Sequence, residues 1–141
     1  MSISYLTRVV EFTATHRIRR ADWTAERNVE TFGRAASDHG HRYQCRVTVQ
    51  GELPGGGTEG GVVSLAALDA LLAQEVTGRF DGRHINEDVP EFGDGKRLPT
   101  GEALAVYVWQ RLAPQMPPGV RLHAVRIQEG PHIYSEYFGE E

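Results

Sequence analysis

Hydrophobic and polar residues alternate along two stretches of the chain, the pattern of β-strands with one buried face. The first stretch ends at His16, and its apolar face is made by every second residue: Leu6, Val10, Phe12 and Ala14. Arg8 is the one charged residue on that face. The second stretch, residues 41–53, places an equivalent set on one side: His41, Tyr43, Cys45, Val47 and Val49. We therefore predict two strands that each bury one face.

Two later stretches repeat their apolar residues at the helical spacing of three and four positions. Ser64 is a predicted N-cap, Gly78 a predicted end, and the apolar stripe between them comprises Leu65, Leu68, Leu71, Leu72 and Val76. Thr100 is the predicted N-cap of the second helix, with Glu102 in the first turn, where a carboxylate suits the helix dipole. Its core face comprises Leu104, Tyr107, Val108, Trp109 and Leu112, and residues 114–119 end it.

The remaining segments complete an α+β domain. Residues 120–129 and 132–138 predict a hairpin around the Gly130-Pro131 turn, and the polar connection 17–38 predicts a short helix over 25–32. The order strand, strand, helix, helix, strand, strand predicts a four-stranded antiparallel sheet with both helices on one face. Such a sheet has two open edges, so we expect ring-like self-association that continues the sheet between subunits.

Composition narrows the class of protein without changing this picture. At 141 residues the chain fits a single domain spanning residues 1–141. Fifteen basic against nineteen acidic residues, with no basic run, argue against a nucleic-acid partner. No apolar run approaches the ~18 residues of a membrane span. A lone cysteine suits a reducing compartment, so we expect a cytoplasmic protein.

Three histidines are candidate metal ligands. His39 and His41 are two positions apart at the start of a predicted strand, so their imidazoles project from one face. His16, at the end of the other strand, is the candidate third ligand. Three neutral imidazoles and an open position form a typical catalytic zinc site. The alternative is that these are surface histidines at strand ends, because a His-x-His pair alone is a weak signal.

Several segments together resemble a known family, the 6-pyruvoyl-tetrahydropterin synthases and the related 6-carboxy-tetrahydropterin synthases of queuosine biosynthesis. They are Phe12-Thr13-Ala14-Thr15-His16, Phe32-Gly33-Arg34, His39-Gly40-His41-Arg42-Tyr43, Asn86-Glu87-Asp88-Val89-Pro90, Pro99-Thr100-Gly101-Glu102, Ala105-Val106-Tyr107-Val108-Trp109 and Glu129. The resemblance covers nearly the whole chain. It implies the tunnelling fold, assembled as a trimer or as a dimer of trimers (a hexamer).

The resemblance also implies a site. A zinc ion would be held by His16, His39 and His41, and a pterin-like ring would be held by Glu129, assisted by Thr100 and Glu102. This is chemically reasonable, because a carboxylate pairs well with a two-donor N–C–N edge in a dry pocket.

The chain departs from the family at its proton-handling groups. The loop before the zinc histidines, residues 33–38, carries alanine where the family has a cysteine base, and Gly82 follows Asp81 where the family has a histidine. Asp81 itself is retained, and His84 or Asp38 are candidate substitutes for the missing groups. Glu26 and Glu30 are further possibilities that the sequence does not rank.

Three other residues that carry proton-transfer side chains are assigned structural or surface roles. Cys45 lies four residues beyond His41, roughly 13 Å along a strand, far outside the ~3 Å reach of a base, so we expect a core residue. His123 and His132 are assigned to the terminal hairpin.

Two functions remain open. The first is an enzyme that uses zinc in a lyase-type reaction on the side chain of a pterin-like or purine-derived ring, altered from the usual triphosphate elimination. The second is a non-catalytic pterin-binding protein that kept the ring pocket and lost the proton-transfer groups. A purely structural ring protein is a weaker third, because a buried pocket glutamate without a ligand would be costly.

Overall fold

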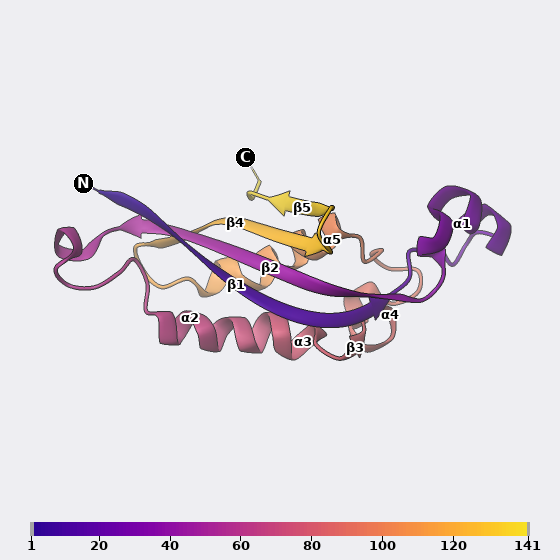
Figure 1. The fold of residues 1–141 in the computed structure, drawn as a ribbon, viewed down its shortest axis with the longest axis horizontal. Coiled ribbons are helices and arrows are strands. Elements are labelled where there is room, and N and C mark those ends of the chain that lie inside the picture. Colours follow the sequence, from indigo (N-terminus) through magenta and orange to yellow (C-terminus); the bar gives the residue numbers. More distant parts are fainter. Residues whose placement is uncertain (1, 141) are drawn as a thin grey trace.

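A long, twisted sheet organises the computed structural model, which describes residues 2–140 (Figure 1). Strands β1 (Ile3–His16) and β2 (His39–Glu52) pair antiparallel along their whole length. Strand β4 (Val120–Glu129) pairs with the other side of β2, and β5 (Tyr134–Tyr137) pairs with β4, both antiparallel. The α+β class and the antiparallel order of these four strands agree with the prediction.

A fifth strand differs from the prediction of a four-stranded sheet. Strand β3 (Arg83–His84) pairs in parallel with β1 at Ala14 and Thr15, so the sheet order is β3-β1-β2-β4-β5. A strand of two residues inside a polar loop is too short to show any period of hydrophobicity, which is why the sequence did not reveal it.

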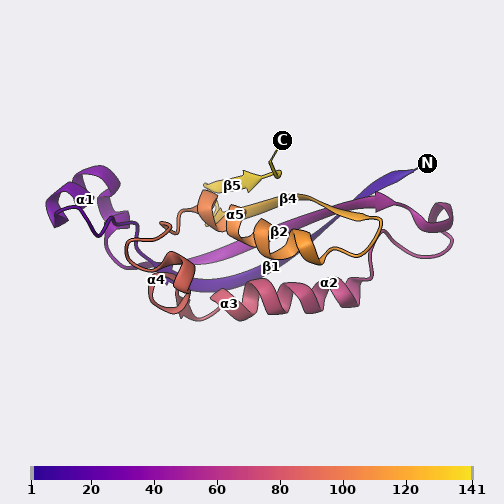
Figure 2. The ribbon, with the colours of Figure 1, turned by 180° about the vertical axis from the view of Figure 1, so that it is seen from behind.

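The main helices cover one face of the sheet, as expected (Figure 2). They are α2 (Leu65–Leu72) and α5 (Gly101–Leu112). Both predicted N-caps are confirmed, because the hydroxyl of Ser64 accepts from the amide of Ala67 at 3.2 Å and that of Thr100 from Ala103 at 3.1 Å. The core between helices and sheet includes Phe12, Tyr43, Val47, Leu68, Leu72, Leu104, Val108 and Ile127.

Gly78 does not end the first helix, contrary to the prediction. The helical path continues from α2 through a π-helical turn (Ala73–Thr77) into α3 (Gly78–Phe80). Gly78 has an ordinary helical φ of −65°. A Cβ at this position would lie 2.6 Å from the carbonyl oxygen of Ala73, so the glycine permits a close backbone approach in the wide turn.

The π-helical turn buries Glu75, whose carboxylate is satisfied by groups from two helices. It accepts hydrogen bonds from Arg79 at 2.9 Å, Arg111 at 3.1 Å and Gln115 at 2.6 Å. Burial alone would raise the pKa of Glu75, but these donors outweigh it and lower the pKa below its usual value. The network therefore ties α3 to the end of α5.

Arg8, the one charged residue on the apolar face of β1, pairs with a carboxylate of α2. Its guanidinium forms two hydrogen bonds with the carboxylate of Asp69, at 2.7 and 2.9 Å. The pair lies at the exposed margin of the helix layer, so the charge is not buried.

The connection after β1 contains α1 (Ala25–Phe32), with the predicted bounds. This helix projects from one end of the molecule in both views (Figures 1 and 2). Strand β2 begins at His39, two residues earlier than expected, and a short helix α4 (Ile85–Asp88) follows β3. Among residues 2–140, no helix is long and apolar enough to cross a membrane.

Candidate functional site

The register of β1 and β2 brings the three predicted histidines together. His16 and His39 are direct partners across the two strands, and His41 lies two residues further along β2 on the same face. Each imidazole offers one nitrogen, and these three atoms lie within 4.8 Å of one another. The structure therefore assembles the expected ligand set from two strand ends.

Backbone carbonyls fix the orientation of two of these rings. His16 Nδ1 lies 2.8 Å from the carbonyl oxygen of Pro99, and His39 Nδ1 lies 2.7 Å from that of Ser37. A carbonyl can only accept, so Nδ1 carries the proton in each ring and Nε2 keeps a free lone pair. Metal-binding histidines usually have such a partner on the second nitrogen, so these residues fit a zinc ion.

Electrostatics favour the neutral form of His16 and His41. Burial lowers the pKa of His16 to about 4, with the neighbouring His39 and His41 adding to the effect and the Pro99 carbonyl opposing it. Burial and His39 also lower the pKa of His41. Because a metal ligand must be unprotonated, the cluster is poised for an ion at neutral pH.

Glu129, the predicted ring-binding residue, lies at the end of β4 with an unsatisfied acceptor. Its strand partner is Tyr43, two residues beyond His41 on β2. Its Oε1 is buried and has no hydrogen-bond partner within residues 2–140. Burial raises the pKa of Glu129, the nearby Glu102 raises it further, and His39 opposes the shift. Glu129 thus lies in the electrostatic reach of both Glu102 and the histidine cluster.

The start of α5 supplies the other two predicted ring-binding residues. Thr100 caps the helix, and Glu102 in the first turn accepts a hydrogen bond from the hydroxyl of Ser135 at 3.3 Å. Gly101 lies between them, close to Glu129 Oε1. Sequence reasoning missed Ser135 and noted Gly101 only as part of a family motif, because nothing local in the sequence places β5 beside the start of α5.

Asp38 and His84, two of the candidate substitute groups, are in contact. His84 Nε2 lies 3.1 Å from Asp38 Oδ1, and Arg17 donates to the same oxygen at 3.0 Å. These two partners, His84 first, lower the pKa of Asp38. The second ring nitrogen of His84 is buried and has no hydrogen-bond partner in the described chain. The pair adjoins the histidine cluster, because Asp38 directly precedes His39.

Asn86 holds this arrangement in place. Its side-chain oxygen accepts from the amide of Arg17 at 2.9 Å, and its side-chain nitrogen donates to the carbonyl of Arg17 at 3.0 Å. This two-way contact docks α4 on the end of β1 and so brings His84 to Asp38. Sequence reasoning assigned no role to Arg17, and the buried asparagine was noted only as part of a family motif.

Asp81 is placed differently from the other predicted proton-handling residues. Its Oδ1 accepts from the amide of Thr13 at 2.9 Å, and the amide of Gly82 donates to the carbonyl of Thr13 at 2.7 Å. The contact lies on the outer edge of β1, immediately before β3 in the chain. Within residues 2–140, no hydrogen bond joins Asp81 to the Asp38–His84 pair.

The remaining candidates lie away from the histidine cluster. Cys45 is buried in the core, and burial raises the pKa of its thiol to about 12. Glu26 and Glu30 are exposed on α1. His123 packs edge-on against Tyr5, and His132 is exposed in the β4–β5 turn.

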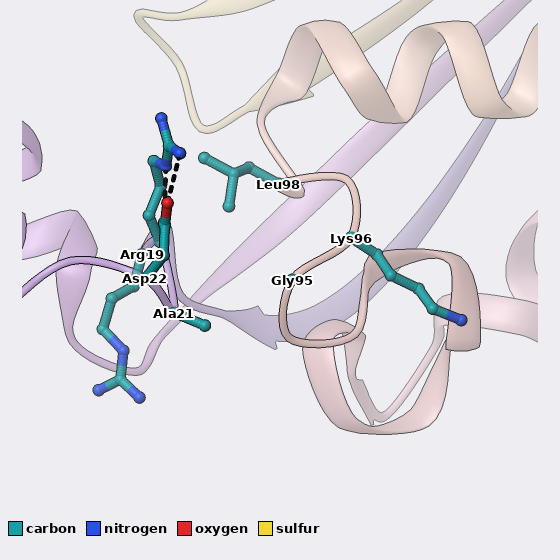
Figure 3. A pocket seen from close by; sticks show the side chains of 7 residues that line it. Arg19, Ala21, Asp22, Gly95, Lys96 and Leu98 are labelled. Atoms are coloured by element: carbon teal, nitrogen blue, oxygen red, sulfur yellow. Dashed lines mark hydrogen bonds and ion pairs between the residues drawn. The ribbon is translucent and has the colours of Figure 1, made fainter.

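A cavity of about 550 Å³ lies between the chain leaving β1 and the loop before α5 (Figure 3). An ion pair of Arg20 with Asp22 forms one wall, and Leu98 points toward it. Arg19 and Lys96 extend away from each other. The cavity is lined by none of the predicted site residues.

Comparison with known proteins gives matches over nearly the whole chain. The family model described as 6-pyruvoyl tetrahydropterin synthase matches residues 5–140. The 6-pyruvoyl tetrahydrobiopterin synthase of Poecilia reticulata is 33% identical over 140 residues, covering 98% of this chain and 92% of that protein. The human enzyme of the same name is 33% identical over 137 residues, covering 96% and 91%.

Solved structures agree with this result. The structure of 6-pyruvoyl tetrahydropterin synthase from Caenorhabditis elegans superimposes with a TM-score of 0.89, at 31% identity, over 99% of this chain and 98% of that one. A Plasmodium vivax 6-pyruvoyltetrahydropterin synthase, described as a catalytic-residue mutant with glutamate changed to alanine, gives a TM-score of 0.65 at 14% identity. It covers 97% of this chain and 98% of its own, and this likeness concerns the fold alone.

Proposed function

The chain belongs to the 6-pyruvoyl tetrahydropterin synthase family, and on that premise we propose that it acts on the side chain of a pterin-like or purine-derived ring. The proposed reaction is zinc-dependent and lyase-type, altered from the usual triphosphate elimination. The observation that carries this proposal is the buried, unpartnered Oε1 of Glu129 beside three clustered histidines. A buried acceptor of this kind is costly unless a ligand satisfies it.

The ring would bind through Glu129. A carboxylate that faces an N–C–N edge accepts two parallel hydrogen bonds, which fixes the plane of the ring as well as its position. Glu102, at the start of α5, extends the acceptor surface. Thr100 supports this arrangement by capping the helix.

The zinc ion would be held by His16, His39 and His41. When bound, zinc would polarise an oxygen on the side chain of the pterin-like ligand and so acidify the neighbouring C–H bond. The protein's own contribution is to keep His16 and His41 neutral by burial, and to orient His16 and His39 through carbonyl contacts at Nδ1 that leave Nε2 free. His39 and Glu129 interact electrostatically, so we propose that a ring held by the glutamate binds with its side chain toward the histidines.

Asp38, oriented by His84 and Arg17, is the proposed proton acceptor in place of the missing thiol. Both contacts use Oδ1, which leaves Oδ2 available to receive a proton. The lowered pKa keeps Asp38 ionised at neutral pH but makes it a weak base, so we expect slow turnover. Asp81 is retained as a second candidate, although its Oδ1 is committed to the backbone of Thr13.

The protein would act as a ring-like homo-oligomer in the cytoplasm, a trimer or a dimer of trimers. Support for the ring comes from the sheet edges: β3 pairs with only two residues of β1, and β5 is the last strand on the other side. Unpaired edges of this length invite continuation by another copy. The single buried cysteine suits a reducing compartment.

A non-catalytic pterin-binding protein is the alternative. It is favoured by one observation: His84 and Arg17 lower the pKa of Asp38. With no cysteine in the loop, this weak base would be the main candidate for proton removal. In that case the ring pocket would be used to carry or sense a pterin.

The test uses purified protein, measured zinc content and 7,8-dihydroneopterin triphosphate. We expect pterin to bind and triphosphate release to be slow or absent, with another product formed from the side chain. Glu129→Gln should abolish ring binding, whereas Glu136→Gln, a carboxylate on β5 that pairs with Arg126 at 3.2 Å, should leave it unchanged. Triphosphate release as fast as that of an authentic synthase would refute the altered reaction, and failure to bind any pterin would refute both functions.

A further inference from the structure

Gly101 leaves a space that two polar side chains use. A Cβ added at this position would lie 2.8 Å from Ser135 Oγ and 3.1 Å from Glu129 Oε1. Its φ is not in the left-handed region, so the absence of a side chain is not required by the backbone. The glycine instead lets the end of β4, the start of α5 and the middle of β5 converge on one point.

Ser135 provides the contact that orients Glu102. Its hydroxyl donates to Glu102 Oε1 at 3.3 Å, and Glu102 is otherwise exposed at the first turn of α5. The remaining oxygen, Oε2, is therefore left to face a ligand. Without this contact an exposed glutamate would sample several rotamers, so the hydroxyl reduces the entropy lost when Glu102 binds.

We propose that Ser135, in the space that Gly101 provides, is a positioning residue that aims Glu102 at the same ring edge as Glu129. The inference rests on the proposed ring-binding function and adds the residue that orients the second carboxylate. Glu129 can accept one ring N–H and one hydrogen of an adjacent amino group, and Glu102 then accepts the second amino hydrogen. The site selects a 2-amino-4-oxo ring over a 2,4-dioxo ring, which presents an oxygen where the amino group would be.

The closing experiment measures the affinity of the metal-free protein for two probes. These are pterin, which has the 2-amino group, and lumazine, which has an oxygen at that position. The wild type is expected to bind pterin at least about 10-fold more tightly, because an oxygen at that position would face the buried carboxylate of Glu129 without a hydrogen to donate. Ser135→Ala should weaken pterin binding by about 3- to 10-fold, the range expected for one hydrogen bond, and lumazine binding by less than about 2-fold.

Three further variants separate positioning from general stability. Ser135→Thr keeps the hydroxyl and should restore pterin affinity to within about 2-fold. Gly101→Ala should weaken pterin binding by about 10-fold while the melting temperature does not fall, since alanine normally favours a helix over glycine. Ser4→Ala, at the far end of β1, is the matched serine control and should change neither affinity.

Failure of the positioning role gives a different result from failure of the proposed ring-binding function. If the wild type binds pterin and Ser135→Ala binds it equally well, or loses both probes by the same factor, the positioning role is wrong and the ring-binding function stands. If the wild type binds neither probe, both fail. Should Ser135→Ala be unstable, Glu102→Gln, which keeps the shape of the side chain, must show the same selective loss of pterin or the inference is overturned.

Discussion

His84 and Asp38, 46 residues apart in the sequence, meet with Nε2 of the imidazole 3.1 Å from Oδ1 of the carboxylate. Arg17 donates to the same oxygen at 3.0 Å and also lies 3.2 Å from the imidazole nitrogen. A carboxylate, an imidazole and a guanidinium thus meet next to the three clustered histidines. Because residues 33–38 contain no cysteine, this junction is the proposed source of the base.

Asp38→Asn tests whether the carboxylate of Asp38 is the proton acceptor. The amide keeps the shape of the side chain but cannot accept a proton, so we expect turnover to fall by at least about 10-fold, the lower range for loss of a general base. The affinity for pterin should not change. Steady-state kinetics with product identification provide the measurement. Asp94→Asn, which removes a carboxylate 3.9 Å from Arg17, is the matched control and should retain activity.

Placing a cysteine in the loop before His39 tests whether the lack of a thiol there limits triphosphate release. Ala35 lies in the loop before His39 and is only partly buried, so a cysteine there would be accessible from solvent. Ala35→Cys is expected to raise the rate of triphosphate release from 7,8-dihydroneopterin triphosphate by at least about 10-fold. Ala36→Cys, at a buried neighbouring position, should have little effect. Equal rates in all three proteins would mean that the thiol is not what limits the reaction.

His16 should make the stability of the metal-free protein depend on pH. Its pKa is about 4 in the folded chain and about 6.5 when unfolded, so the unfolded state binds more protons between these values. Stability contributed by the neutral imidazole is therefore complete above pH 6.5 and lost as pH falls toward 4. The free energy of unfolding should drop by up to about 3 kcal/mol from this residue.

Denaturant unfolding in the presence of a chelator, between pH 7.5 and 4.5, provides the measurement. His16→Gln removes the titrating group, so its stability should change less with pH than that of the wild type, even if it is lower throughout. His132→Gln, an exposed position in the β4–β5 turn, should keep the wild-type slope. The interpretation is wrong if the His16 variant and the wild type show the same slope.

Val9→Pro tests ring assembly through the free edge of β1. The amide and carbonyl of Thr13 point outward, toward Asp81 and Gly82. Because backbone groups alternate along a strand, those of Val9 point to the same outer edge. Proline there removes a hydrogen-bond donor that only a neighbouring subunit would use. We expect a folded protein of reduced oligomeric mass by light scattering.

Val10→Pro is the matched control for this experiment. Val10 is the partner of Cys45, and its amide points into the β1–β2 ladder. Proline at this position should unfold the chain, as judged by circular dichroism. An assembled, unchanged oligomer in the Val9 variant would exclude this edge as the interface.

The sequence by itself determined the features that depend on neighbouring residues. Alternation identified β1 and β2, and the hydroxyls of Ser64 and Thr100 marked the starts of α2 and α5, because a cap contacts an amide only three residues away. Strand β4 has the bounds predicted from its pattern. The three histidines were identified as a set, since strand geometry fixes which face each imidazole occupies.

Only the tertiary structure decided the contacts between distant segments. The pairing of Asp38 with His84, the orientation of Glu102 by Ser135 and the space at Gly101 depend on strand order and on how loops dock, and no local pattern encodes these. The same holds for β3 and for the continuation of the first helix past Gly78. Local preferences are set by a few adjacent residues, whereas a site is set by the packing that brings several segments to one place.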